Sequence, residues 1–169
     1  MSPEARVELL VEELAAAEVY RRMHARHELS AMGAKATPAL LRALAKGTDR
    51  HRWEICKTLV AIRDARAAPA LVEMLRDEVM AVRWVAAEAL IVLGTPAIRP
   101  LLHALEEHFN SVFLRESAHH VLWGLDRLEV LEPEVKVVLR KLGGSQPGID
   151  IAVAARRALA GRTEHVQSQ

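Results

Sequence analysis

Histidine and cysteine have the widest chemical use of the residues in this sequence, and their spacing gives no complete site. His24 and His27 lie three residues apart, which can place two metal ligands on one face of a helix, and His119 and His120 follow much later. No third ligand accompanies either pair, so we expect no metal. Cys56 is the single cysteine, which excludes an internal disulfide, and we expect a buried, small apolar residue.

The sequence also lacks the short motifs that mark common enzyme sites. It contains no Gly-x-Gly-x-x-Gly loop, no Walker phosphate loop, no Gly-x-Ser-x-Gly elbow and no paired aspartate motif. We therefore expect a protein that binds rather than catalyses, with no cofactor.

Composition limits the class of protein and of partner. The chain has 169 residues, of which 51% are hydrophobic and 27% charged, and no apolar run long enough to span a bilayer. Its first residues carry an acid early and lead into an amphipathic helix, unlike a secretion signal, so we expect a cytoplasmic protein. The formal net charge is +1 with both signs interspersed, which argues against nucleic acid as the main partner.

The helices that must position any site follow a regular period. Alanine and leucine dominate, and aromatic residues make up 4% of the chain, so helices are favoured throughout. One leucine recurs at intervals of 30, 31 and 32 residues, and an apolar residue stands four positions before it each time. At about 100° per residue these offsets fall on one side of a helix, which we expect to be packed. The recurring leucines are Leu29, Leu59, Leu90 and Leu122.

The pattern predicts five antiparallel helix pairs in a single domain, residues 1–160. The fifth pair is degenerate, because Ala152 stands where the other second helices carry an arginine. Arg156 and Arg157 give this pair the polar outer face that a terminal repeat needs. Residues 161–169 are polar, and we expect a flexible tail there. The expected pairs are residues 3–31, 37–62, 66–93, 96–125 and 132–160.

The third unit carries the clearest family resemblance. It contains Pro69-Ala70-Leu71, Leu75, Asp77, Val82-Arg83, Ala86-Ala87, Ala89-Leu90 and Leu93-Gly94. With these residues the sequence resembles HEAT-like repeats, in the short bacterial form also seen in the phycobilisome-lyase type, over nearly the whole chain. The resemblance implies an all-α fold, a right-handed α-solenoid of about five HEAT-like helix pairs. Function is left open, because this family includes adaptors, lyases, hydroxylases and DNA-binding enzymes.

An arginine stands seven residues before each recurring leucine, on the packed side of the second helix. A buried guanidinium needs fixed partners, so we expect hydrogen bonds between neighbouring repeats, with anion binding as the alternative. In HEAT-like repeats a turn aspartate and this arginine commonly form a ladder between neighbours. Here only the unit of Asp77 and Arg83 carries both residues, and the partners of the other three arginines stay open. The row consists of Arg22, Arg52, Arg83 and Arg115.

Stacked repeats turn each position of the second helices into a row across one surface. In HEAT-like folds these helices line the concave face, so we expect the three tryptophans to share a groove. The apolar strip consists of Trp53, Val60, Trp84, Ile91 and Trp123. The polar side chains at its edge are His27, Lys57, Glu88 and His120. Half-buried packing between repeats is the alternative for each tryptophan.

An apolar strip edged by mixed charge is expected of a groove for a peptide, a helix or a flat organic ligand. We expect a non-enzymatic scaffold or adaptor that binds a protein or peptide through this groove. The alternative is a tetrapyrrole (bilin) lyase or chaperone-like ligand binder of the phycobilisome-lyase type, since flat apolar ligands suit tryptophan walls.

Two further HEAT-like activities fit this sequence poorly. His27-Glu28 resembles the His-Glu pairs that hold a di-iron centre in deoxyhypusine hydroxylase, but the pair occurs once and not directly after a repeat arginine. HEAT-like alkyl-purine DNA glycosylases use aromatic and acidic residues, which Trp53, Trp84 and Glu88 could supply, against a basic rim that is weak here.

Overall fold

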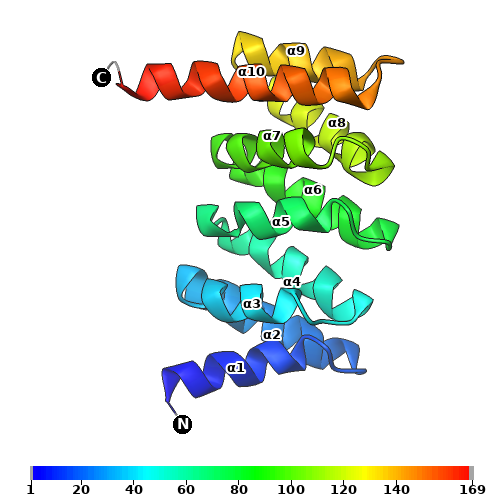
Figure 1. The fold of residues 1–169 in the computed structure, drawn as a ribbon. Coiled ribbons are helices and arrows are strands. Elements are labelled where there is room, and N and C mark those ends of the chain that lie inside the picture. The colour runs from blue at the N-terminus through cyan, green and yellow to red at the C-terminus, as the bar shows by residue number, and fades with distance from the viewer. Residues whose placement is uncertain (1, 168–169) are drawn as a thin grey trace.

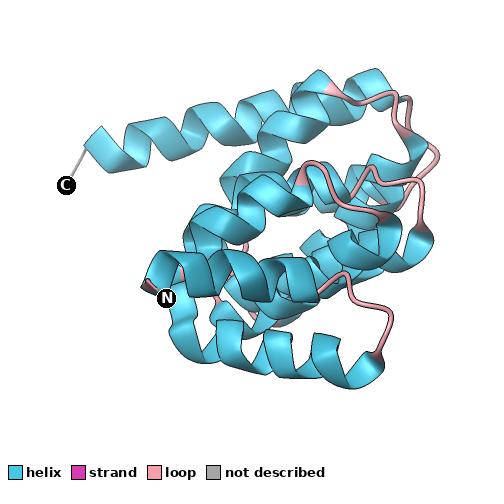
Figure 2. Ribbon diagram, turned by 90° about the horizontal axis from the view of Figure 1, so that it is seen from below, coloured by secondary structure: helices cyan, strands magenta, loops and turns pink. Residues whose placement is uncertain are grey.

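The computed structural model of the protein describes residues 2–167, and the side chains among them up to residue 162. Within this part the chain forms α-helices, short 3-10 helices and loops, with no strand (Figure 2). The α-helices follow one another as five pairs that stack in chain order (Figure 1). The fold is therefore the expected all-α solenoid.

In each pair the first helix is shorter than the second. The first helices are α1 (Pro3–Glu13), α3 (Thr37–Leu44), α5 (Ala68–Met74), α7 (Ile98–Glu107) and α9 (Pro133–Leu142). The second helices are α2 (Val19–Met32), α4 (Asp49–Ile62), α6 (Met80–Leu93), α8 (Val112–Arg127) and α10 (Gly148–Gln167). The 3-10 helices that precede α3, α5 and α7 are η1 (Gly33–Lys35), η2 (Ala65–Ala67) and η3 (Thr95–Ala97).

The bounds differ most from the expected ones at the C-terminus. Helix α10 continues to Gln167, through most of the segment in which we expect a flexible tail, and its last part projects past the neighbouring helices (Figure 1 and Figure 2). Residues 168 and 169 of that segment lie outside the described part. No helix among the described residues is long and apolar enough to cross a membrane.

The recurring apolar residues form the core of the stack. Leu29, Leu59, Leu90 and Leu122 are at most 2% exposed, and the residues four positions before them are fully buried. Cys56 belongs to the same core, and burial raises the pKa of its thiol to about 12. A protonated thiol at neutral pH is a poor nucleophile, so Cys56 is a packing residue here.

The connections between pairs share a left-handed residue that ends the second helix. Gly33 and Gly94 have φ of 62° and 74°, and Arg63 takes the equivalent place with φ of 57°. After Arg63, the carboxylate of Asp64 accepts a hydrogen bond from the backbone N–H of Arg66 at 3.0 Å. The guanidinium of Arg66 also bonds this carboxylate, which lowers the pKa of Asp64 to about 2.

The helices form two layers, and the fifth pair enters them in reversed order. In Figure 1, α1, α3, α5 and α7 lie in front of α2, α4, α6 and α8, and α10 lies in front of α9. Accordingly α10 packs against α7, whereas α9 packs against α8. The connection from α8 to α9 lacks the 3-10 helix of the three preceding connections and has its left-handed residue, Glu129, two positions after the helix end. The missing arginine at Ala152 fits this reversal, because α10 does not occupy the second-helix layer.

Candidate binding surface on the second helices

The arginine row ties each second helix to the turn that precedes it. Each of the four arginines donates from Nη1 to a backbone carbonyl five or six residues earlier, at 2.6–3.0 Å. The accepting carbonyls belong to Ala16 and Ala17, Gly47, Asp77 and Glu78, and Phe109. These carbonyl groups lie in the turn that follows the first helix, where no helical N–H is available to bond them.

Two of the arginines also reach a carboxylate on the next repeat. Arg52 donates through Nε and Nη2 to Asp77 at 2.6 and 3.0 Å, and Arg22 donates through Nε to Glu54 at 3.1 Å. Asp77 and Arg83 belong to the one unit that carries both ladder residues, but their side chains do not pair with each other. The Arg83 guanidinium contacts the main chain of Asp77 and lies 4.1 Å from the Phe113 ring. The aspartate bonds the preceding repeat because its turn faces that repeat's second helix.

Glu54 is a structural residue that the sequence analysis missed. Its side chain lies at the α2–α4 contact, where it accepts from Arg22 and, at 2.6 Å, from Arg26. The residue is 4% exposed, so the two guanidinium groups compensate a buried charge. Its position directly after Trp53 was visible in the sequence, but no other unit repeats an acid there.

We use the term second-helix surface for the solvent-facing side of α2, α4, α6 and α8. The tryptophans contribute unequally to it. Trp84 and Trp123 are 60% and 47% exposed, whereas Trp53 is partly buried against the core. Val60 and Ile91 are also partly buried core neighbours. The expected apolar strip therefore consists of two exposed rings and three side chains that also pack between repeats.

The best organised part of this surface joins α6 to α8. The rings of Trp84 and His120 stack with centroids 4.7 Å apart and planes at 26°. His120 Nε2 also lies 2.9 Å from Glu88 Oε1, which fixes the orientation of the imidazole. A hollow of about 220 Å³ lies beside this stack. It is lined by Met80, Arg83, Trp84, Ala87, Glu116, Ser117 and His120.

The other two tryptophans each have a cation over the ring. The Lys57 ammonium lies 4.5 Å from the centroid of Trp53, and the Arg127 guanidinium lies 5.0 Å from that of Trp123. Trp53 also lines a hollow of about 310 Å³ between α4 and the start of α6. Exposed cation–π pairs contribute about 0.5–1 kcal/mol. The two cations therefore lie near the rings but are held only weakly.

Not every expected groove residue joins this arrangement. His27 is exposed on α2 and makes no hydrogen bond or ion pair in the described part of the chain. Ile91 serves the contact between α6 and α8, because a Cβ added to Gly124 would lie 2.6 Å from its Cδ1. Among the described residues, no group of three histidine, cysteine or acidic side chains could hold a metal ion.

The second-helix surface is more apolar at its helix starts than the strip alone suggests. Six further large apolar residues there are between 41% and 73% exposed. They are Val19, Tyr20, Met23, Met80, Val112 and Phe113. The sequence signal for all six is their place one to three residues from the row arginine, and Met80 is the most exposed of them.

A family model described as HEAT repeats matches residues 7–91. The chain belongs to the HEAT repeat family. A second model, described as the PBS lyase HEAT-like repeat, matches residues 82–107, which contain Trp84 and Glu88. A search of curated protein sequences found no match.

The HEAT fold is also seen in a solved structure with low sequence identity. The chain is similar to one in the complex of CpcE and CpcF of phycocyanin lyase from Nostoc sp. PCC7120, with a TM-score of 0.63. The identity is 21%, and the alignment covers 92% of this chain and 98% of that chain. At this identity the likeness concerns the fold of the HEAT repeats.

Proposed function

We propose that this protein is a ligand-binding HEAT-repeat protein of the phycobilisome-lyase type, and that its second-helix surface takes a flat, conjugated ligand of the linear tetrapyrrole class. The observation that carries the proposal is the Trp84–His120 stack, in which Trp84 stays 60% exposed. An indole held in place by a second ring offers an apolar face on which a conjugated ligand can stack. The lyase-type repeat match supports this assignment, because it covers Trp84.

The size of the hollow defines how such a ligand would lie. At about 220 Å³ it is smaller than the roughly 300–1,000 Å³ of enclosed small-molecule pockets. The ligand would therefore lie across the surface, from Trp84 toward Trp53 or Trp123. Lys57 and Arg127 stand at these two rings and could bind its carboxylates. Such an open mode suits a protein that hands its ligand on.

Biliverdin, a linear tetrapyrrole, tests the proposal by visible absorption and induced circular dichroism. The unaltered protein is expected to shift the absorption band and to induce a dichroic signal, and Trp84→Ala is expected to lose most of both. Tyr20→Ala is the matched control, because Tyr20 is an exposed aromatic residue on another second helix. No spectral change at high micromolar biliverdin, or an equal change in both variants, contradicts the proposal.

A non-enzymatic protein scaffold is the second candidate function. The observation that favours it is the further exposed apolar area at the helix starts, such as Met23 at 55% and Val112 at 54%, which lies outside the hollow beside Trp84. Exposed apolar patches of this kind often mark protein interfaces. The neighbouring structure is itself a complex of two proteins.

The two candidates differ in what removal of these helix-start residues does. If a protein is the occupant, Met23→Ser with Val112→Ser, two exposed residues that do not line the hollow beside Trp84, is expected to abolish capture of a specific partner from a lysate of the source cells. The same double variant is expected to retain biliverdin binding if the tetrapyrrole is the ligand. Capture that survives this variant and Trp84→Ala contradicts the scaffold function on this surface.

A further inference from the structure

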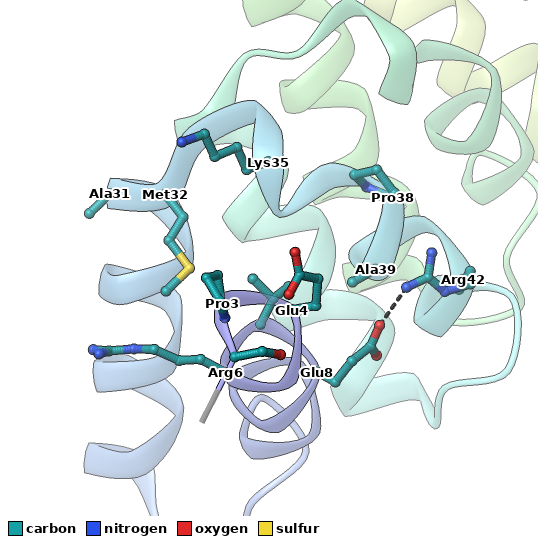
Figure 3. A pocket seen from close by; sticks show the side chains of 12 residues that line it. Pro3, Glu4, Arg6, Glu8, Ala31, Met32, Lys35, Pro38, Ala39 and Arg42 are labelled. Carbon is teal, nitrogen blue, oxygen red and sulfur yellow. Dashed lines mark hydrogen bonds and ion pairs between the residues drawn. The ribbon is translucent and has the colours of Figure 1, made fainter.

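An open pocket of about 850 Å³ lies at the N-terminal end of the stack, away from the tryptophans. It is bounded by the first half of α1, the end of α2 and the start of α3 (Figure 3). Its volume falls in the range of about 300–1,000 Å³ that is usual for small-molecule sites. The hollows beside Trp84 and Trp53, at about 220 and 310 Å³, are much smaller.

The pocket exists because only the second half of α1 is anchored. Leu10, Val11 and Leu14 are at most 5% exposed, whereas the first turns contribute only the partly buried Val7. Helices α5 and α7, by contrast, begin with buried residues, such as Ala68 and Ile98. With few apolar residues in its first turns, α1 leaves an unfilled space between itself and α3.

The walls of the pocket are largely apolar. Val7, Met32, Pro38 and Ala39 line it from three helices, and the Met32 side chain points toward Pro3 across the space (Figure 3). Methionine adapts its shape easily, so this wall can adjust to an apolar body of variable outline. The interior therefore favours a ligand with a hydrocarbon portion.

The charges at the pocket favour an anionic head group. Three cations line it against two acids, and Lys35 makes no ion pair in the described part of the chain. Arg6 pairs with Glu28, and Arg42 with Glu8, but these arginine side chains are 52% and 65% exposed. Exposed pairs contribute little, typically about 0–1 kcal/mol, so a ligand carboxylate can replace a glutamate at low cost.

The helix starts add to this positive potential. Both α1 and α3 begin at the pocket, and Pro3 and Pro38 from their first turns line it. Helix N-termini carry a partial positive charge that attracts anions. The two helix starts therefore attract an anionic head group in addition to the three cations.

We propose that this N-terminal pocket binds an amphiphilic carboxylate, a molecule with an apolar chain and a terminal carboxyl group. The chain lies against Val7, Met32 and Ala39. The carboxylate pairs with Arg42, Lys35 or Arg6 at the rim. This site is separate from the second-helix surface and does not depend on the function proposed above.

Calorimetric titration with decanoate, below its micelle concentration, tests the site. Ala31→Trp fills the pocket from an exposed position, so folding is expected to be kept, and Lys35→Ala with Arg42→Ala removes two cations. Both variants are expected to weaken decanoate binding at least about tenfold. Arg76→Ala is the matched control, an exposed arginine paired with Glu73 outside the pocket, and is expected to bind normally.

Two further measurements test the charge of the preferred ligand and the separation of the two sites. Decylammonium, which has the same chain and the opposite charge, is expected to bind much more weakly than decanoate. Trp84→Ala is expected to leave decanoate binding unchanged, which separates this site from the tryptophan surface. The proposal is overturned by no measurable heat with decanoate, by equal binding of decylammonium, by unaltered binding to Ala31→Trp, or by loss of binding in Trp84→Ala.

Discussion

Single charged residues at the contacts between repeats differ widely in how much they stabilise the fold. Glu54 is 4% exposed and accepts from Arg22 and Arg26, so one buried carboxylate is held between two guanidinium groups. Asp77 pairs with the single guanidinium of Arg52 through two bonds. Surface pairs such as Glu8 with Arg42 lie in water, where screening removes most of their effect.

Glu54→Gln is expected to lower the free energy of unfolding by about 1.5–3 kcal/mol, because it removes a charge that accepts two charged hydrogen bonds in a buried place. Urea unfolding followed by circular dichroism measures the loss. Glu8→Gln is the control and is expected to change stability by less than about 1 kcal/mol. Equal losses in the two variants would mean that the buried position gives Glu54 no special role.

Cys56 is expected to resist alkylation in the folded protein. Its pKa is raised to about 12 by burial, above the usual 9.0, so raising the pH from 8 to 10 forms thiolate in the unfolded chain and little in the folded one. Iodoacetamide labelling at both pH values, with and without urea, measures this. The folded protein is expected to react at least about a hundredfold more slowly. Prompt labelling without urea contradicts the buried assignment.

At the scale of helices, close contact between α6 and α8 depends on one glycine. A Cβ on Gly124 would lie 2.6 Å from Cδ1 and 2.8 Å from Cγ1 of Ile91. Gly124→Ala is therefore expected to cost about 1–3 kcal/mol of stability. Ile91→Ala in the same chain frees the space, so the double variant is expected to lose less than the sum of the single ones. Additive losses in thermal unfolding would show that the two residues do not meet.

The connection after α4 offers a stabilising change. Arg63 has φ of 57°, a left-handed conformation that costs energy for a residue with a Cβ, and Gly33 and Gly94 fill the equivalent places elsewhere. Arg63→Gly is expected to raise the free energy of unfolding by about 0.5–1 kcal/mol. Chemical unfolding measures the gain. A loss of stability would mean that the Arg63 side chain matters more than its backbone.

The order of the helices could be predicted because each second helix carries the same packed positions, and Leu29 and Leu90 are buried as the period requires. The reversed order of α9 and α10 could not be predicted from the sequence. An apolar stripe shows that a helix has a packed side but does not show which layer it joins. The missing arginine at Ala152 was the one sign of this change.

The site was predicted less completely than the fold. The three tryptophans were placed on the second helices, but the exposure of each ring depends on the side chains of the next repeat. His120 stands over Trp84, whereas Trp53 packs beside the start of α6. The partner of Arg52 stays open in the sequence, because spacing within one unit does not show that the aspartate of the next unit is in reach.

On the scale of the whole molecule, the stack separates two surfaces. The second helices offer exposed aromatic rings in open hollows, and the N-terminal end offers a deeper pocket with apolar walls. In the reversed last pair, α9 lies beside α8. Helix α9 is therefore the last helix in the layer of the second helices, and it carries no member of the arginine row.

We propose that Trp84 and its stacked partner, His120, form the binding surface for a flat ligand. The most direct test is the ratio of biliverdin dissociation constants between Trp84→Ala and the unaltered protein. Loss of a stacking platform is expected to raise the dissociation constant at least about tenfold, while Tyr20→Ala stays within about twofold of the unaltered protein. A ratio near one, with both proteins folded, would contradict the account.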